Sequence, residues 1–353
     1  MKTPSRFPVV VPSEDLPDVD ASDGVDVVDV DEILAETFQE VEKRILPHDR
    51  KRALYSNDGP TDWFQNSTRR WIAAMLADEG VHEPIEPGAK ITKAEIRSRD
   101  SGILAGLHAV DLLIREWMPG ANFTWTSSEG SNIEKDTCIL TIEACRHQIL
   151  VCERIILNIL GRLSGIATNT ALWVANSQIP LSATRKTSWG VLDKAAVAIG
   201  GGLTHRLNRP DALMLKENDL ATTAESGEKG STRVRNILRD LPLEKIGAFV
   251  TIEVGSLDEA LAAAETWAER LLETKEDVKL NIMLDNMGPE LTKDAVLDLE
   301  TRGLREYVTL EASGNVKLTN LDAWQSSGVD VISASELHRA TEPIDLTCIF
   351  EGV

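Results

Sequence analysis

The stretch AFVTIEVGSLDEALAAAETWAERLLETKEDVKLNIMLDN (248–286) decides the fold class. Its two ends, AFVTIEV (248–254) and KLNIMLDN (279–286), are short apolar runs, which are typical of buried strands. The segment between them, SLDEALAAAETWAERLLE (256–273), is long enough for one helix. A strand, a helix and a second strand in this order predict one unit of a parallel sheet that is covered by helices.

The same alternation extends to both sides of this stretch. Four more apolar runs are separated by helical segments, namely IPLSATRKT (179–187), ALMLKEN (212–218), YVTLEASGN (307–315) and VDVISAS (329–335). Every run ends in polar residues, and all strand carboxyl ends of a β/α barrel open on one face. Six runs are fewer than the eight of a complete barrel, so we expect an incomplete β/α barrel whose polar strand ends converge.

The part of the chain before these runs shows a different pattern. KITKAEIRS (90–98) alternates apolar and polar residues, and DTCILTIEA (136–144) indicates a further strand. AGLHAVDLLIREWM (105–118) has helical spacing, and residues 146–178 form a long, strongly helical stretch. This mixture predicts an α+β domain ahead of the barrel.

The composition indicates a globular protein with a small-molecule partner. Its 353 residues include 37 basic and 57 acidic ones, a formal charge of −20 and 42% hydrophobic residues. No stretch approaches the ~20 apolar residues that span a bilayer, and the start lacks a signal-peptide pattern, so we expect a cytoplasmic location. The four cysteines form no CxxC pair, which argues against a zinc site or a disulfide framework. The acidic excess disfavours non-specific nucleic-acid binding.

The charge is unevenly distributed along the chain. Residues 1–34 contain nine acidic and two basic side chains, which predicts a disordered tail. Residues 151–218 contain eight basic and four acidic side chains. A basic segment in an acidic chain indicates a site for a small polyanion.

Five basic residues of this segment are candidate anion ligands. They follow strand runs or the turn Gly200–Gly202, and they are Arg185, Lys186, His205, Arg206 and Lys216. Arginine's planar fork suits carboxylates and phosphates, and lysine supplies a compact charge. The alternative is that each is an exposed charge or a member of a surface ion pair.

Three carboxylates, Glu253, Asp285 and Glu311, follow alternating apolar residues near the strand ends. Inward carboxylates are costly unless they are paired or bind a metal, so these could hold Mg²⁺ or sugar hydroxyls. The alternative is a salt bridge between each carboxylate and a barrel lysine. The turn at Ser313, Gly314 and Asn315 could offer donors to a phosphate. GxSxG, the Walker P-loop and GxGxxG in a strand-to-helix context are absent, which excludes the common hydrolase, nucleoside triphosphatase and dinucleotide-binding interpretations.

Taken together, the motifs resemble those of quinolinate phosphoribosyltransferase, also called nicotinate-nucleotide pyrophosphorylase (carboxylating). The resemblance covers roughly residues 90–345 in the family's order. It is carried by AEIRSRDSGILAGLHA (94–109), ERIILNILGRLSGIAT (153–168), TRKTSWG (184–190), KAAVAIGGGLTHRL (194–207), DALMLKEN (211–218), IEV (252–254), MLDN (283–286), LEASGN (310–315) and GVDVISAS (328–335). Several motifs in one order make the resemblance specific.

The resemblance implies an architecture and a reaction. The fold would be α/β plus α+β, with an N-terminal α/β sandwich domain joined to the incomplete β/α barrel. We therefore divide the chain into an acidic tail (1–34), the sandwich domain (35–148), the barrel domain (149–335) and a C-terminal segment that returns to the sandwich (336–353). The reaction converts quinolinate and phosphoribosyl pyrophosphate, with Mg²⁺, into nicotinate mononucleotide, pyrophosphate and CO₂, in a homodimer whose sites are shared between subunits.

The resemblance also implies residue roles. It assigns the pyridine carboxylates and the pyrophosphate to Arg154, Arg185, Lys186, His205, Arg206 and Lys216, with Arg154 reaching the partner's site. It assigns the ribose and Mg²⁺ to Glu253 and Asp285, which with Lys186 and Lys216 would be catalytic. It assigns the 5′-phosphate to Ser313, Gly314, Asn315, Ser333, Ser335 and His338.

The sequence departs from the family pattern at the pocket rim. Trp189 replaces a proline, two residues are missing before Lys194, and Ser335 aligns with a glycine of the last phosphate loop. The histidine of that loop corresponds either to His338 after a gap or to Arg339 without one. Two alternatives follow, a related phosphoribosyltransferase for another aromatic carboxylate or heterocycle, and a non-catalytic phospho-ligand-binding protein.

Overall fold

The computed structural model describes residues 46–216, 230–339 and 341–351. The chain divides into two units, 1–45 and 46–353, and only the second contains described residues. The predicted acidic tail (1–34) therefore lies outside the described residues. No helix of the described part is long and apolar enough to cross a membrane, and all four cysteines are free thiols.

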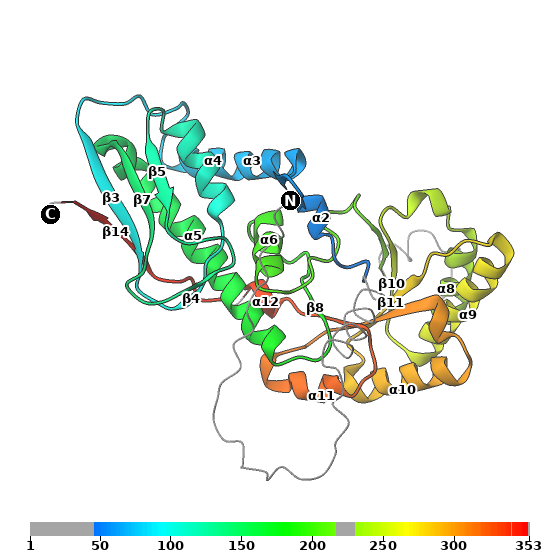
Figure 1. The fold of residues 1–353 in the computed structure, drawn as a ribbon. Helices are drawn as coiled ribbons and strands as arrows, with labels where there is room; N and C mark the ends of the chain where they lie inside the picture. Colours follow the sequence, from blue (N-terminus) through cyan, green and yellow to red (C-terminus); the bar gives the residue numbers. More distant parts are fainter. Residues whose placement is uncertain (1–45, 217–229, 340, 352–353) are drawn as a thin grey trace, which may run out of the picture. The chain divides into compact units, whose positions relative to one another are not determined.

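The N-terminal part of the described chain contains a four-stranded antiparallel sheet with the order β14-β3-β7-β5 (Figure 1). Its strands are β3 (Ile91–Ser98), β5 (Asn122–Trp125), β7 (Cys138–Cys145) and β14 (Leu346–Phe350). Two of its helices are α3 (Asp62–Asp78) and α4 (Leu107–Trp117), and α3 begins where the Thr61 side chain accepts a hydrogen bond from the Phe64 amide. Because β14 lies after the barrel strands in the chain, the C-terminal end returns to this sheet.

Several short elements had no periodic signal in the sequence. They are α2 (Lys51–Leu54), β1 (Tyr55–Ser56), β2 (Gly59–Pro60), β4 (Gly102–Ile103) and β6 (Asn132–Ile133). β1 pairs with β2 and β4 pairs with β6, each as a two-stranded antiparallel sheet. Elements of two to four residues are too short to show a hydrophobic period.

Helix α5 (Arg146–Ala175) links the antiparallel sheet to the barrel (Figure 1). It contacts β3, β7 and β14 of the antiparallel sheet, and it also contacts α6 (Val191–Ile199) and α12 (Glu336–Arg339). Two glycines let the returning chain approach closely: a Cβ at Gly165 would lie 2.2 Å from the Glu342 carbonyl oxygen, and one at Gly161 would lie 2.8 Å from that of Ile344. Larger residues at these positions would push the C-terminal segment off the helix.

The barrel part is a six-stranded parallel sheet with the order β8-β13-β12-β11-β10-β9. The strands are β8 (Leu181–Ser182), β9 (Leu213–Leu215), β10 (Val250–Val254), β11 (Leu280–Asp285), β12 (Val308–Ser313) and β13 (Val331–Ser333). Among the described residues, the helical elements between them are α6, α8 (Gly230–Asp240), η1 (Leu243–Lys245), α9 (Leu257–Thr274), α10 (Gly288–Thr301), η2 (Arg305–Tyr307), η3 (Leu318–Asn320) and α11 (Leu321–Gln325). All six predicted strands are confirmed, and the sheet stays open between β8 and β9, which confirms the incomplete barrel.

Candidate active site

A cavity of about 620 Å³ lies at the carboxyl ends of the barrel strands. Six basic side chains line it, namely Arg185, Lys186, Arg206, Lys216, Lys317 and Arg339. Three acidic side chains line it as well, namely Glu253, Asp285 and Glu336. In a chain with a formal charge of −20, this positive excess makes the cavity suited to a polyanion.

Most residues predicted for the site are brought together here. Twelve of the fourteen line the cavity: Arg185, Lys186, His205, Arg206, Lys216, Glu253, Asp285, Ser313, Gly314, Asn315, Ser333 and Ser335. They come from segments that are far apart in the sequence and meet because parallel strands end on the same side. The separate roles of these residues in binding and catalysis stay predictions.

Arg154 and His338 are not among the cavity-lining residues. Arg154 is exposed on α5. His338 is 1% exposed, and its Nε2 accepts a hydrogen bond of 3.3 Å from the Thr184 amide. Burial lowers the pKa of His338 to about 4, so the ring is neutral at pH 7. Of the two residues that the alignment left open for the last phosphate loop, Arg339 is the one that reaches the cavity.

Two of the three acidic side chains of the cavity, Glu253 and Asp285, already have polar partners within the chain. Lys216 and Glu253, at the ends of β9 and β10, form an ion pair, which is the salt-bridge alternative weighed for this carboxylate. Asp285 accepts hydrogen bonds from the Ser313 hydroxyl and, at 2.6 Å, from the Asn286 amide group. Both carboxylates keep some exposure toward the cavity, so both can face a ligand there.

The turn after β12 depends on a glycine. Gly314 has a φ of +91°, and a Cβ there would lie 2.3 Å from the Asn286 Oδ1 atom. Asn286 and Asn315 also have positive φ angles, and the Asn315 amide group donates to Asn286 Oδ1 at 3.1 Å. This close contact between the loops after β11 and β12 holds the Ser313 hydroxyl against Asp285.

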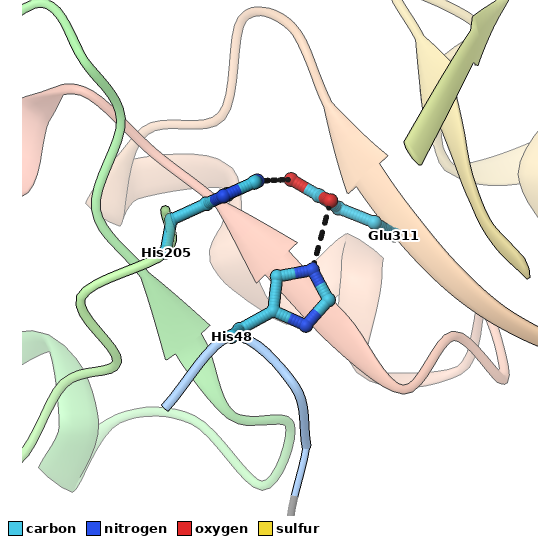
Figure 2. Close-up of side chains that lie close together, drawn as sticks. All are labelled: His48, His205 and Glu311. Atoms are coloured by element: carbon cyan, nitrogen blue, oxygen red, sulfur yellow. Dashed lines mark hydrogen bonds and ion pairs between the residues drawn. The ribbon is translucent and has the colours of Figure 1, made fainter. Parts of the chain in front are cut away.

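The expectation that Glu311 shares a metal or sugar site with Glu253 and Asp285 is wrong. Glu311 is fully buried and lies beneath the cavity residues instead of lining the cavity. It accepts hydrogen bonds from His48 Nε2 at 3.0 Å and His205 Nε2 at 3.2 Å, as Figure 2 shows. Asn281 Nδ2 at 2.6 Å and the Ser333 hydroxyl complete the set of donors.

The charge state of Glu311 follows from these donors. Burial alone would raise the pKa of Glu311, but the neighbouring His205 and His48 hold it well below the usual range. Glu311 is therefore a buried, negatively charged carboxylate that lies directly behind the cavity residues His205 and Ser333. His48, one of its partners, was not singled out from the sequence, because nothing in the local pattern marks a contact with a residue 263 positions away.

His205 reaches the cavity with both ring nitrogens engaged by the protein. Its Nδ1 accepts the Arg206 amide at 2.7 Å, so in the neutral ring the proton is on Nε2, which donates to Glu311. Burial lowers the pKa of His205 to about 4, although the nearby Glu311 acts in the opposite direction. The uncharged imidazole of His205 therefore lines the cavity. Neither of its nitrogens is available to exchange a proton with a ligand.

Two further buried groups hold the basic loops in place. Lys194, 1% exposed, donates to the Thr204 carbonyl at 2.6 Å, and burial together with Arg185 and Arg206 lowers its pKa to about 7. Asp193 accepts the Ser188 and Trp189 amides at 2.8 and 3.1 Å and forms a bidentate pair with Arg162. These contacts shape the 184–190 loop that presents Arg185 and Lys186.

The Arg162 guanidinium also stacks over the Trp189 ring, 5.1 Å from its centroid. Trp189, the replacement that distinguished this loop in the sequence, packs there and is not among the residues that line the cavity. The replacement in this shortened loop therefore affects the packing behind the cavity, and it does not change a residue that lines the cavity.

Two family models match the chain over most of its described length. The N-terminal domain of quinolinate phosphoribosyl transferase matches residues 74–164, and the C-terminal domain of the same family matches residues 166–348. Both matched ranges lie beyond the first 73 residues, which contain His48.

Several curated proteins are similar to this chain along nearly their whole length. A probable nicotinate-nucleotide pyrophosphorylase (carboxylating) of Methanothermobacter thermautotrophicus is 34% identical over 276 residues, which are 76% of this chain and 91% of that protein. Its counterpart in Archaeoglobus fulgidus is 35% identical over 265 residues, 73% of this chain and 94% of that protein. The solved nicotinate-nucleotide pyrophosphorylase of Francisella tularensis superposes with a TM-score of 0.65 at 28% identity, covering 81% of this chain and 97% of that chain.

Proposed function

Because the chain belongs to the quinolinate phosphoribosyltransferase family, we infer that it transfers the phosphoribosyl group of phosphoribosyl pyrophosphate to quinolinate. Quinolinate loses CO₂ in the process, and the products are nicotinate mononucleotide and pyrophosphate, as in NAD biosynthesis. The observation that carries this function for the present chain is the cavity, where six basic and three acidic side chains meet at the strand ends.

The charge of the cavity answers the main physical difficulty of the reaction. Both reactants are polyanions, and holding them side by side in a site of low dielectric constant would cost several kcal/mol without cations. We propose that Arg185 and Arg206 bind the two pyridine carboxylates, since a guanidinium can hold a carboxylate through two hydrogen bonds. Arg206 is buried, and its Nη1 donates to the Ala212 carbonyl at 3.0 Å, which limits its freedom before the ligand arrives.

The first step exchanges two bonds at C1 of the ribose. The bond between C1 and the pyrophosphate oxygen breaks, the pyrophosphate leaves with the electron pair, and the pyridine nitrogen forms the new bond to C1. In our proposal Lys186 and Lys216 stabilise the negative charge that develops on the leaving group. Glu253 and Asp285, which also line the cavity, stabilise the positive charge that develops on the sugar.

The second step removes the carboxylate next to the new bond. The quaternary ring nitrogen accepts the electron pair of the breaking carbon–carbon bond, CO₂ leaves, and a proton then takes its place on the ring carbon. This step needs an oriented substrate in a site that excludes water. His205 does not supply this proton, because both nitrogens of its ring are hydrogen-bonded within the protein.

The residues of the cavity fit a bound Mg²⁺ of the kind that a phosphate substrate brings with it. Mg²⁺ is usually held by one or two carboxylates, several waters and substrate phosphates, and it does not require a cage made of protein alone. We propose that Glu253 and Asp285 face this ion, because both are partly exposed to the cavity. When bound, the ion would neutralise charge on the pyrophosphate.

Two further proposals concern the assembly and the location of the protein. Arg154 is exposed on α5 and is not part of this chain's own cavity lining, which supports a role for it in the site of a second subunit of a homodimer. We also propose a cytoplasmic location, which agrees with the metabolic role of the relatives' reaction.

The observations favour quinolinate over the two alternatives drawn from the sequence. Trp189, which motivated a different acceptor, does not line the cavity. The altered last phosphate loop, which motivated a non-catalytic protein, keeps a cation at the cavity in Arg339. Neither departure therefore removes a charged group that the reaction needs.

The test is a comparison of acceptors. Purified protein is incubated with phosphoribosyl pyrophosphate, Mg²⁺ and either carboxyl-labelled quinolinate or nicotinate, and CO₂ and mononucleotide are measured. We expect CO₂ release and nicotinate mononucleotide with quinolinate, no mononucleotide with nicotinate, and loss of turnover when a chelator is added. Turnover of nicotinate at a similar rate, or none with quinolinate, would refute the assignment.

A further inference from the structure

A short segment outside the family-matched ranges crosses the open side of the barrel. The segment Leu46–Arg50, called the strap below, lies next to the loop Thr204–Asp211. This loop joins the two edges of the open sheet: Leu203 bridges to Ser182 of β8, and β9 begins at Leu213. The loop also carries His205 and Arg206 into the cavity.

The strap is attached to both ends of this loop. At the first end, the Thr204 hydroxyl donates to the His48 carbonyl at 3.2 Å and accepts the Arg50 amide at 2.9 Å. At the other end, the Arg50 guanidinium reaches both carboxylate oxygens of Asp211 at 2.8 to 3.2 Å. Asp211 in turn accepts the Leu207 amide at 2.9 Å, so the ion pair continues into the middle of the loop.

His48 extends this attachment into the barrel interior. Its ring is 0% exposed, its Nε2 atom lies 3.0 Å from Glu311 Oε2, and its centroid lies 4.9 Å from that of His205 in an edge-on contact (Figure 2). Phe249 packs against both rings. Glu311 is thereby held between one histidine of the strap and one of the loop, and the strap fixes the carboxylate that orients His205.

These three side chains have the spacing of a metal site, since their ligand atoms all lie within 4.8 Å of one another. The hydrogen bonds argue against that use. A backbone amide can only donate, so His205 Nδ1 must accept the Arg206 amide and Nε2 must carry the proton. A protonated nitrogen has no lone pair for a metal, and Glu311 already accepts from Asn281 and Ser333.

We propose that His48 is a positioning residue for the acceptor end of the active site. Through Glu311 it holds the ring of His205, and through the strap's contacts with Thr204 and Asp211 it holds the backbone that carries Arg206. His205 needs this support because its φ of +53° is unfavourable for a residue with a side chain. The proposal rests on the proposed function, in which Arg206 binds a carboxylate of quinolinate.

The test separates positioning from general stability with three variants. His48→Leu replaces the imidazole by an apolar side chain that has no hydrogen-bond donor. His48→Gln provides a donor near the position of Nε2. Arg52→Ala is the control, because it changes an exposed residue of α2 next to the strap. His48→Leu should raise the KM for quinolinate about tenfold, the scale of one hydrogen bond to a charged group, with the KM for phosphoribosyl pyrophosphate within about twofold. His48→Gln should recover most of the loss, and Arg52→Ala should match the wild type. Equal changes in both KM values, or none, would overturn the proposal.

A second measurement does not depend on turnover. Amide hydrogen exchange of peptides covering residues 203–212 should be faster in His48→Leu and in Arg50→Ala than in the wild type or Arg52→Ala. Arg50 is 29% exposed, so its replacement costs less folding energy than a change of the buried His48. Unchanged exchange in both variants would overturn the proposal. Failure of wild-type turnover with quinolinate would instead refute the proposed function and leave the exchange result to decide the role of the strap.

Discussion

Glu253 and Glu311 lie at the same level of the six-stranded sheet but in opposite surroundings. The pairing of β10, β11 and β12 aligns both with Met283, so their side chains project from the same face of the sheet. Glu253 is 20% exposed at the cavity and pairs with one lysine, whereas Glu311 is 0% exposed and accepts from four side chains. The strap and the loop Thr204–Asp211 cover Glu311 and leave Glu253 exposed to the cavity. The segments that pack over the sheet, and not the position in the strand, therefore make one glutamate a buried anchor and the other a cavity residue.

The largest effect that distinguishes the two glutamates should be on stability. Glu311→Gln places an amide group among four donors, and we expect it to lower the free energy of unfolding by about 3–5 kcal/mol, the cost of breaking a buried charged network. Glu253→Gln should cost less than about 1 kcal/mol, because its partner Lys216 is 45% exposed and screened by solvent. Urea unfolding of both variants measures the difference, and equal losses of stability would contradict the different roles of the two glutamates.

The next prediction asks whether the cavity is complete within one chain. If Arg154 serves the site of a second subunit, Arg154→Ala should lower kcat/KM about a hundredfold, in line with the loss of a charged contact to the substrate. Mixing it with inactive Lys186→Ala protein under conditions of subunit exchange should restore about a quarter of the wild-type activity, because each mixed dimer regains one intact site. Lack of recovery despite proven exchange would place Arg154 outside the shared site.

A smaller effect is expected from the buried cation of the cavity. Arg206→Ala should raise the Kd for quinolinate about thirtyfold, since roughly 2 kcal/mol is the scale for leaving a charged partner unpaired. Arg209→Ala, in the same loop but exposed and outside the cavity lining, is the matched control. Calorimetric titration without phosphoribosyl pyrophosphate measures both variants, and unchanged affinity in Arg206→Ala would remove this residue from the acceptor site.

The smallest effect concerns the acid sensitivity of the cavity wall. The pKa of His338 is about 4 in the folded chain, below its ordinary value near 6.5, so the unfolded chain takes up the proton first as the pH falls. Its contribution to stability is therefore complete above about pH 6.5 and is lost progressively as the pH falls toward 4. His338→Gln can still accept the Thr184 amide and should flatten this part of the profile. Parallel profiles for the two proteins would contradict the assignment.

Much of the fold was predictable because it rests on local periodicity. The strands β10, β11 and β12 are long enough to show their apolar pattern, and α5 shows its helical spacing over thirty residues. The polar residues at the strand ends were predicted to converge for a topological reason, since parallel strands end on one side. Twelve of the fourteen residues expected at the site do line one cavity.

The contacts that the sequence did not indicate are long-range ones between single side chains. Lys194 is buried and donates to the Thr204 carbonyl, and nothing in its local sequence pattern indicates this contact. Lys317 lines the cavity two positions after Asn315, where a cation in a loop gave no distinct signal. Such contacts depend on how loops pack against one another, and a linear pattern carries no information about that packing.

The sequence by itself determined that the chain forms an open parallel barrel with basic and acidic side chains at its strand ends, because strand and helix periods and the polarity of run ends are local properties. Only the tertiary structure decided that Glu311 is buried, that Arg339 and not His338 lines the cavity, and that His48 contacts Glu311. Burial and hydrogen-bond partners are set by segments up to 263 positions apart, and they exist only after the chain has folded.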